Sequence, residues 1–382
     1  MKKRLFAVSL LATIGLLFIS CQSTVVVRHL EPALVDLSDY RTLAIASTTV
    51  NANGIGNYSP WINGFDDFGY RFSTGYERDT AEIAAKTASA TLTQTLQNSG
   101  FFTVLPPSDT DNYLGIGLDG LTLLINKGVK AIVNSSISYM DLDEHSYTED
   151  ITEYKTDPVT HKSIKTVVGR KRYISQTVTL TLTYVIKDIR TGSVLTSNSY
   201  TGKKSRDTLV DTRMYTGATS SNFVEDRIYS YTYAPSVTDM TKAIITSFQS
   251  DIAHQLSPTW KVQTIALMDN KPKDANVEGA YKLADQGSVE AAYRLFSSNW
   301  QATGHVPSGF NAALMLEAMG KLDDAVSLMN KVSLVTYEPR VFSELSRMLN
   351  AQKQQAAAEN QITGTSPAGE AGMTTTQIIT VK

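Results

Sequence analysis

Apolar and polar positions alternate with two different periods along this chain. From Val178 to Tyr184 every second residue is apolar, and threonines stand between them. A period of two predicts an antiparallel strand with one buried face. The turn RTGS (190–193) and the stretch VLTSNSYTG (194–202) then predict the second strand of a hairpin.

Other segments of the same region predict further strands and helices. Continuous apolar, β-branched runs indicate buried strands, and apolar residues at steps of three and four indicate amphipathic helices. Strands are expected at 42–50, 101–106 and 129–143, and helices at 78–98, 120–128 and 237–256. The mixture of elements predicts an α/β (α+β) domain over 40–262, with helices packed on a mixed sheet.

The helical period returns over 275–358, and the sequence there repeats itself. ADQGSVEAAYRLF (284–296) aligns with EAMGKLDDAVSLM (317–329) at an offset of 33 residues. In each copy a glycine would end the first helix, an alanine would let the second helix pack closely, and a large apolar residue would fill the space between repeats. These repeat-packing positions are Gly287, Ala292 and Phe296 in the first copy, and Gly320, Ala325 and Met329 in the second.

This repeat resembles the tetratricopeptide family, which implies an all-helical segment that binds protein partners. Two repeats are few for a free-standing stack, so a third helix over 339–356 or the first domain is expected to support them. A generic helical bundle with a chance period is the alternative.

The start of the chain has the pattern of a delivery signal. Three basic residues precede the almost wholly apolar run 5–18, and Ser20 and Cys21 follow. This is typical of a secretory signal peptide over 1–20. A cysteine directly after a small residue resembles the lipobox of bacterial lipoproteins, which implies lipid (palmitate) attachment at Cys21; Phe18 stands where that family prefers leucine. An ordinary signal peptide with a chance cysteine is the alternative, as is a retained membrane anchor.

The expected organisation follows from these patterns. A tether over 21–39 would join the lipid to the α/β domain, and a low-complexity, disordered tail would occupy 359–382. In enterobacterial lipoproteins a residue other than Asp after the cysteine implies the outer membrane. Gln22 stands there, so we expect a protein of the cell envelope, lipid-anchored at the outer membrane and facing the periplasm.

Charge and cysteine content exclude several classes. Removal of the leader takes the formal charge from −2 to −5, because Lys2, Lys3 and Arg4 leave with it. This mild negative charge argues against a nucleic-acid-binding protein. No cysteine follows Cys21, so a disulfide framework and a cysteine-based zinc site are excluded.

Motifs for catalysis or cofactor binding are absent or out of context. GIGLDG (115–120) matches the dinucleotide pattern, but the polar stretch before it predicts a loop rather than the required strand. The five histidines are isolated, so no metal site is expected. Neither a nucleophile elbow nor a phosphate-binding loop is found. We therefore expect no enzyme activity and no cofactor.

Three polar stretches are expected to lie at the surface. DLDEHSYTED (141–150) indicates a solvated strand end, and GRKRY (169–173) indicates a solvated hairpin tip. The stretch 203–235 indicates a long loop. Its candidate partner contacts are four tyrosines, because exposed tyrosine is favoured in interfaces: Tyr215, Tyr229, Tyr231 and Tyr233.

Part of the chain resembles a known group of envelope proteins. The stretches that carry the resemblance are LQNSGFFTVLP (96–106), GVKAIVNSSISYMD (128–141) and VIKDIRTGSVLTS (185–197). They are similar to the domain shared by curli-secretion-type lipoproteins, lipoprotein activators of penicillin-binding proteins and the N-terminal domain of TolB. In the curli relatives two hairpins per subunit assemble into a pore. Here 144–177 and 203–235 alternate poorly, which disfavours a pore.

The sequence therefore predicts a non-enzymatic envelope lipoprotein that binds a protein partner, as a scaffold or activator in envelope assembly. Lipid on Cys21 would hold it at the membrane, and the helical repeats would bind the partner. An oligomeric outer-membrane secretion channel of the curli-exporter type is the first alternative, and an uncharacterised hydrolase is the second. The identity of the partner and the oligomeric state stay open.

Overall fold

The computed structural model divides the chain into two units. Unit 1 holds the described residues of Met1–Ala33 and Pro258–Ser366, and unit 2 holds those of Leu34–Ser257 and Pro367–Lys382. The residues that the structure describes are 23–50, 76–157, 159, 161–215, 225–231, 235–365 and 380–381. The expected signal peptide and Cys21 lie outside them.

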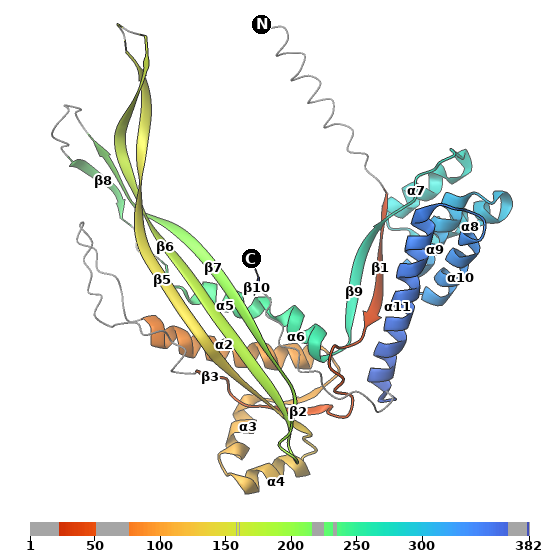
Figure 1. The fold of residues 1–382 in the computed structure, drawn as a ribbon, viewed down its shortest axis with the longest axis horizontal. Helices are drawn as coiled ribbons and strands as arrows, with labels where there is room; N and C mark the ends of the chain where they lie inside the picture. Colours follow the sequence, from red (N-terminus) through yellow and green to blue (C-terminus); the bar gives the residue numbers. More distant parts are fainter. Residues whose placement is uncertain are drawn as a thin grey trace. The chain divides into compact units, whose positions relative to one another are not determined.

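Unit 2 is built on a mixed sheet, which confirms the predicted fold class (Figure 1). Its parallel part consists of β4 (Thr103–Leu105), β2 (Thr42–Ile45) and the start of β5 (Ala131–Thr156). The antiparallel part continues from β5 through β6 (Ser163–Asp188) and β7 (Val194–Tyr215) to β8 (Glu225–Tyr231). Two short strands pair in parallel, β3 (Thr49–Val50) with β5 and β10 (Thr380–Val381) with β7.

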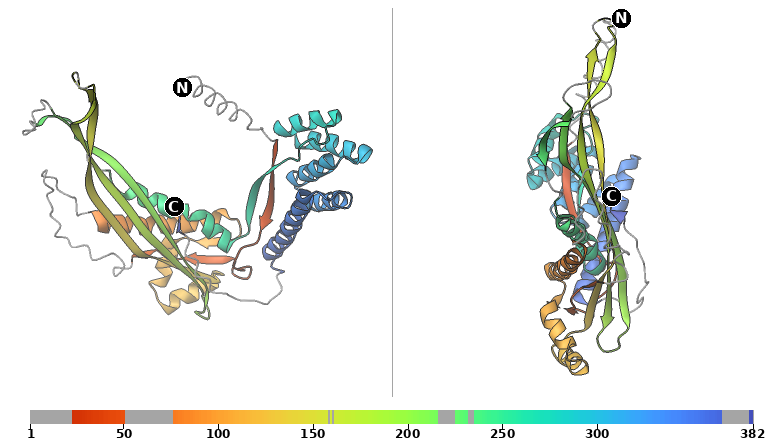
Figure 2. Two further views of the ribbon diagram at one scale, coloured as in Figure 1. Left: turned by 45° about the horizontal axis from the view of Figure 1, so that its top comes forward. Right: turned by 90° about the vertical axis from the view of Figure 1, so that its left-hand side faces the viewer.

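One face of this sheet carries the main core. Along β6 the side chains of Val178, Leu180 and Leu182 are fully buried, while the threonines between them are partly exposed. The buried side chains pack against α2 (Tyr76–Asn98), α5 (Thr238–Ser247) and α6 (Gln249–Leu256), which lie on the same side (Figure 2). The alternation seen in the sequence thus separates a helix-covered face from an open face rich in hydroxyl groups.

A smaller core lies on the other face of the parallel strands. Ala44 and Ile132 pack there against α4 (Leu118–Asn126), beside α3 (Pro107–Leu114). Strand β2 is therefore buried on both faces, which explains its continuous apolar sequence. The stretch before GIGLDG is helix α3 and not the expected polar loop; Pro107 fits there because the first turn of a helix needs no proline N–H.

The antiparallel strands are much longer than predicted from the sequence. β5 runs to Thr156 and β6 begins at Ser163, so 141–150 and 169–173 lie inside strands and are neither a strand end nor a hairpin tip. Likewise, much of 203–235 is strand rather than loop. Cross-strand pairs support this extension, because the rings of Tyr147 and Tyr173 stack at 5.1 Å and Arg170 Nε lies 2.9 Å from Asp150 Oδ1.

We expect Gly202→Ala to destabilise unit 2 by about 1–3 kcal/mol. A Cβ atom at Gly202 of β7 would lie 2.4 Å from Ile244 Cγ2 and 3.1 Å from Phe248 Cζ, so α5 would have to move away from the sheet. Urea unfolding of the mature chain measures the effect. The neighbouring Lys203→Ala, at an exposed position, should change stability by less than about 0.5 kcal/mol; equal losses would contradict the close-packing explanation.

Unit 1 is mainly helical. After the 3₁₀ turn η1 (Ala275–Val277) come α7 (Glu278–Asp285), α8 (Val289–Thr303), α9 (Val306–Ala318), α10 (Leu322–Ser333) and α11 (Pro339–Thr363). Consecutive helices pack against one another. Helix α9 is buried on all sides, and Ser308, Asn311 and Glu317 are buried among its apolar residues.

The expected boundaries of the parts need correction at both ends. The segment 21–39, expected to be a tether, contains β1 (Thr24–Glu31), which pairs antiparallel with β9 (Thr259–Ala266) in unit 1. The strand forms because alternate side chains of β1 are buried against the helices. The expected tail over 359–382 contains the end of α11 and strand β10.

Candidate functional site

The repeat-packing residues occupy equivalent places in the two helix pairs. Gly287 has a φ of +75° and Gly320 a φ of +77°, values that favour glycine. The N–H of Gly287 donates to Ala284 O over 2.9 Å, and that of Gly320 donates to Glu317 O over 2.8 Å. Both glycines therefore end a first helix in the same way. The remaining four positions have no exposed surface: Ala292, Phe296, Ala325 and Met329.

The chain's own strand covers the first helices of these pairs. Helices α7, α9 and α11 all contact β1, in which Val27 is fully buried. Hydrogen bonds secure both ends of the segment: Ser23 Oγ donates to Asp285 Oδ2 over 3.0 Å, and Ala33 N donates to Gln361 Oε1 over 2.8 Å. β1 therefore occupies the surface that α7, α9 and α11 would otherwise offer to a partner. A partner of unit 1 must bind a different surface, unless β1 dissociates from these helices.

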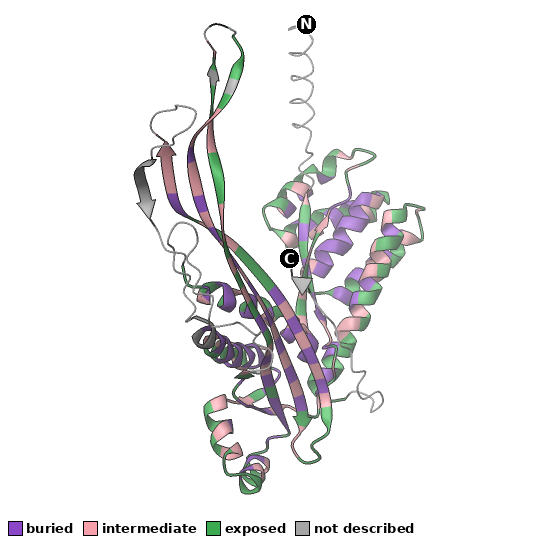
Figure 3. Ribbon diagram, turned by 60° about the vertical axis from the view of Figure 1, so that its left-hand side comes forward, coloured by how far each residue is buried: buried purple, intermediate pink, exposed green. Residues whose placement is uncertain are grey.

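A second feature is the part of the sheet that extends past its helices. Strands β5, β6 and β7 rise beyond the ends of α2 and α5 (Figure 1), and many side chains on this part are exposed or half-buried (Figure 3). We call the part formed by Asp141–Thr156, Ser163–Val178 and Lys203–Tyr215 the ribbon. Among its described residues Ile174 and Val210 form a small buried cluster, while Val178 at its base belongs to the main core.

Along one edge of the ribbon no partner strand is found among the described residues, and we call this the open edge. β5 pairs with β6 on one side, while on the other side it pairs with β2 and β3 only up to Ile137. Within the described ranges no strand pairs with this edge from Ser138 to Thr156. The exposed or half-exposed charged side chains of that strand are mostly acidic: Asp141, Asp143, Glu144, Glu149, Asp150 and Glu153. An open edge has free backbone donors and acceptors and is able to receive another strand.

Three of the four candidate tyrosines lie on two neighbouring strands, β7 and β8, but the register does not place Tyr215 opposite either of the other two. Tyr215 is the last residue of β7 and pairs with Glu225 of β8, which also contains Tyr229 and Tyr231. Tyr233 lies outside the described residues. The strands could have been anticipated from Tyr, Ile, Val and Thr, which favour strands, but the many charges in these segments hide the period of two.

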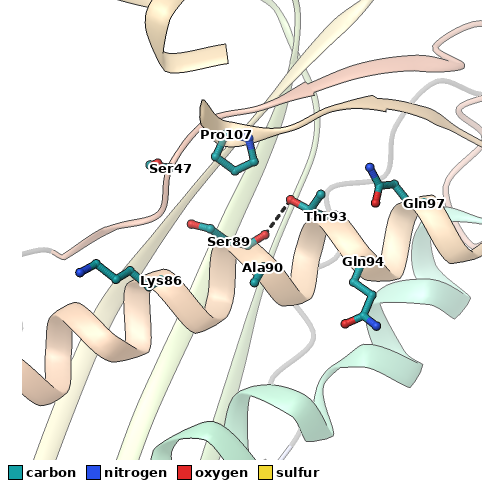
Figure 4. Close-up of a pocket in the computed structure, with 8 residues that line it drawn as sticks. All are labelled: Ser47, Lys86, Ser89, Ala90, Thr93, Gln94, Gln97 and Pro107. Carbon is teal, nitrogen blue, oxygen red and sulfur yellow. Dashed lines mark hydrogen bonds between the residues drawn. The ribbon is translucent and has the colours of Figure 1, made fainter. Parts of the chain in front are cut away.

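A shallow groove of about 450 Å³ lies between α2 and the start of α3 (Figure 4). Thr93 Oγ1 donates to Ser89 O over 2.8 Å at its floor, and Lys86 is the charged residue of its lining. The lining consists of Ser47, Lys86, Ser89, Ala90, Thr93, Gln94, Gln97 and Pro107. Among these described lining residues there is no His, Cys or carboxylate side chain, and Lys86 is the one titratable group.

A serine and a histidine that belong to no sequence motif lie in contact in unit 1. His305 Nδ1 lies 2.7 Å from Ser308 Oγ, the geometry of a nucleophile and its base. Ser308 is fully buried, however, and His305 Nε2 lies 3.0 Å from Pro272 O. A hydroxyl without exposed surface cannot receive a substrate. We conclude that this pair fastens the loop before α7 to α9.

Other kinds of site were sought in the same ranges. Among the described residues, no three His, Cys, Asp or Glu side chains are grouped so as to hold a metal ion. Nor does any helix in that part of the chain have the length and apolar character needed to cross a bilayer.

We expect the stability of unit 2 to fall by about 2 kcal/mol between pH 10 and 12 through Tyr200 alone. Burial raises the pKa of Tyr200 to about 12. The unfolded chain would lose this proton near pH 10 and the folded chain only near pH 12, so the unfolded state binds fewer protons in this window. Stability is therefore full below pH 10 and is lost as the pH rises.

Chemical unfolding at a series of pH values measures this dependence. Tyr200→Phe removes the hydrogen bond from the Tyr200 hydroxyl to Gln255 Oε1 (2.5 Å), so the variant is less stable at neutral pH. Its stability should nevertheless fall less between pH 10 and 12 than that of the parent chain. An exposed tyrosine offers the control, since Tyr337→Phe should leave the slope unchanged. A slope that Tyr200→Phe does not alter would contradict the assignment.

Comparison with known proteins shows similarity to several solved structures. No protein-family model matches the chain, and no curated protein matches its sequence. Three solved structures illustrate the structural similarity: a neuraminyllactose-binding hemagglutinin homolog from Helicobacter pylori, the PelC dodecamer from Paraburkholderia phytofirmans, and lipoprotein GNA1162 from Neisseria meningitidis.

The degree of similarity is low in each case. The hemagglutinin homolog is 10% identical with a TM-score of 0.27, and covers 59% of this chain and 88% of its own. PelC is 11% identical with a TM-score of 0.19, over 61% and 98% of the two chains. GNA1162 is 11% identical with a TM-score of 0.19, over 55% and 98%. These TM-scores are too low to support an argument about function.

Proposed function

We propose that this protein is a non-enzymatic lipoprotein of the bacterial cell envelope that binds a protein partner along the open edge of its ribbon. The observation that carries the proposal is the unpaired side of β5, from Ser138 to Thr156 among the described residues. The lipid attachment at Cys21 and the outer-membrane location belong to the same proposal and rest on the sequence.

The charges on this edge define what kind of partner would fit. Six acidic residues and one lysine stand between Asp141 and Thr156. Such charges prevent pairing with arbitrary strands, because bringing like charges together is unfavourable. A partner strand that carries Lys or Arg would relieve this repulsion and add main-chain hydrogen bonds. The partner we propose is therefore a protein with a basic extended segment.

Lipid attachment at Cys21 would allow even a weak strand-to-strand contact to hold the two proteins together. Confinement of both proteins at one membrane raises their effective concentration, so an affinity that is modest in solution gives a populated complex. We accordingly assign the anchor to Cys21 and partner recognition to unit 2, rather than to the first helices of unit 1, which β1 covers.

Lipid attachment is tested by metabolic labelling with a palmitate analogue and by membrane fractionation. Wild-type protein should carry the label and sediment with membranes, whereas Cys21→Ala should carry none and become soluble. Ser20→Ala keeps a small residue before the cysteine and serves as the control. A labelled Cys21→Ala protein, or an unlabelled wild type that is processed and soluble, would refute the anchor.

Partner binding is tested with a photo-crosslinking amino acid at Tyr154, which is 70% exposed on β5. A crosslinked envelope protein should appear from this position in cells. It should not appear from Tyr337, which is 98% exposed in unit 1. The charge reversal Glu149→Lys/Glu153→Lys should abolish the crosslink, whereas Glu290→Lys on α8 should not. A crosslink that survives the reversal at the β5 edge would contradict the proposal.

A secretion channel is the second candidate, because one observation favours it. The strand order β5, β6, β7, β8 places two antiparallel hairpins side by side, so that copies could join β8 of one to β5 of the next. We rank it second because charged residues occur on every ribbon strand, such as Asp150, Arg170 and Arg213. Ring-sized oligomers in native mass spectrometry, together with conductance across bilayers, would favour the channel. A protein that stays strictly monomeric would exclude it.

A further inference from the structure

The two-stranded sheet of unit 1 has one face that no helix of the described residues covers. In β1 and β9 the inner face packs on the helices, whereas Val26, Trp260 and Val262 on the outer face are 57%, 61% and 62% exposed. Exposed apolar side chains that gather on one surface indicate an interaction site.

The chemistry of the outer face fits a lipid surface. Register places Thr24, Val26 and Arg28 of β1 on the same face as Trp260, Val262 and Thr264 of β9. This set has one cation and no acidic residue, so it is complementary to phosphate groups. The Arg28 guanidinium lies 5.4 Å from the Trp260 ring. Tryptophan prefers the boundary between headgroups and acyl chains, and arginine beside it reaches the phosphates.

The position of this face in the chain supports the same occupant. Thr24 follows Cys21 by three residues and Val26 follows it by five. An extended chain spans at most about 3.5 Å per residue, so Val26 lies within about 18 Å of the proposed lipid attachment. No other exposed apolar side chain of the described residues stands so near to Cys21 in the sequence.

We propose that the outer face of β1 and β9 rests on the bilayer surface, with Trp260 and Val262 among the headgroups and Arg28 at their phosphates. This rests on the proposed function, because the lipid on Cys21 would strengthen, by confinement at the membrane, a contact that the surface already makes by itself. Since the helices pack on the opposite face of the sheet, this contact turns them away from the membrane. It thereby fixes the orientation of unit 1 as well as its location.

The proposal is tested without the lipid, so that its outcome is independent of modification at Cys21. The mature chain with Cys21→Ala is sedimented with vesicles of phosphatidylethanolamine and phosphatidylglycerol at 3:1. We expect it to bind, and we expect Trp260→Ser/Val262→Ser to weaken the partition by about tenfold. Leu334→Ser/Val335→Ser removes two side chains that are 78% and 62% exposed elsewhere in unit 1, and should leave binding unchanged.

Two further measurements guard against a variant that fails to fold. Trp260→Phe keeps an aromatic ring, and lipids brominated near the headgroup should quench the fluorescence of the parent chain more than that of this variant. The parent chain should bind these vesicles more strongly than vesicles without phosphatidylglycerol, and Arg28→Glu should remove this difference. A parent chain that ignores the vesicles, or equal binding by the parent and Trp260→Ser/Val262→Ser, would overturn the proposal. So would loss of a protein partner in Trp260→Ser/Val262→Ser with vesicle binding intact.

Discussion

Arg347→Met should destabilise unit 1 by about 3–5 kcal/mol, the largest effect that we expect from a polar substitution. Glu317 of α9 is 1% exposed and carries a carboxylate that both terminal nitrogens of Arg347 bind, one of them over 2.9 Å. Arg347 of α11 also binds Glu344, over 2.6 Å. Removal of the guanidinium would leave the Glu317 carboxylate buried without a positive partner.

The measurement is urea unfolding of the mature chain, followed by tryptophan fluorescence. Arg294→Met is the matched control, because Arg294 binds Glu290 over 2.6 Å on α8 with both side chains more than two-thirds exposed. An exposed pair of this kind contributes less than about 0.5 kcal/mol. The double variant Arg347→Met/Glu317→Met should recover much of the lost stability. A loss below about 1 kcal/mol in Arg347→Met would show that the pair is not effectively buried.

Phe296→Ala should cost about 3–5 kcal/mol, through the lost burial of the ring and the cavity left behind. Phe296 of α8 has no exposed surface and its ring lies edge-to-face with that of Tyr281 of α7, with centroids 5.0 Å apart. The ring therefore joins the two helices of the first repeat, and it also belongs to the cluster that contains α9.

The neighbouring residue provides the control for this substitution. Leu295 is 41% exposed on the same helix, so Leu295→Ala removes a side chain of similar helix propensity with little burial and should cost less than about 1 kcal/mol. The same urea titration measures both variants. Similar losses for Phe296→Ala and Leu295→Ala would contradict the assignment of Phe296 to the centre of the repeat.

Local patterns in the sequence were sufficient for much of the fold. The period of two in β6 and the apolar run of β2 report directly on burial, so these strands could be predicted. The glycines at 287 and 320 could be placed because a left-handed turn after a helix restricts the residue type. The packing positions around them follow from the repeat and do not depend on distant contacts.

Features that depend on pairing between distant segments could not be predicted from local patterns. β1 is short, and its partner β9 lies more than 200 residues away, so nothing local marks Thr24–Glu31 as part of a helical unit. The outer half of β5 is hidden for another reason. Its acidic residues suit a solvated loop as well as an edge strand, and only the facing bases of β6 distinguish the two.

The placement of β1 has a mechanical consequence. The chain first passes from unit 1 to unit 2 after Ala33, two residues beyond the end of β1, while Ser23 lies at the other end of the same strand. A pull between the N-terminal side of Ser23 and unit 2 would therefore run along β1 from end to end. An extended strand has little slack to give. The load would pass along β1, and the hydrogen bonds of Ser23 to Asp285 and of Ala33 to Gln361 would transmit part of it to α7 and α11 as shear.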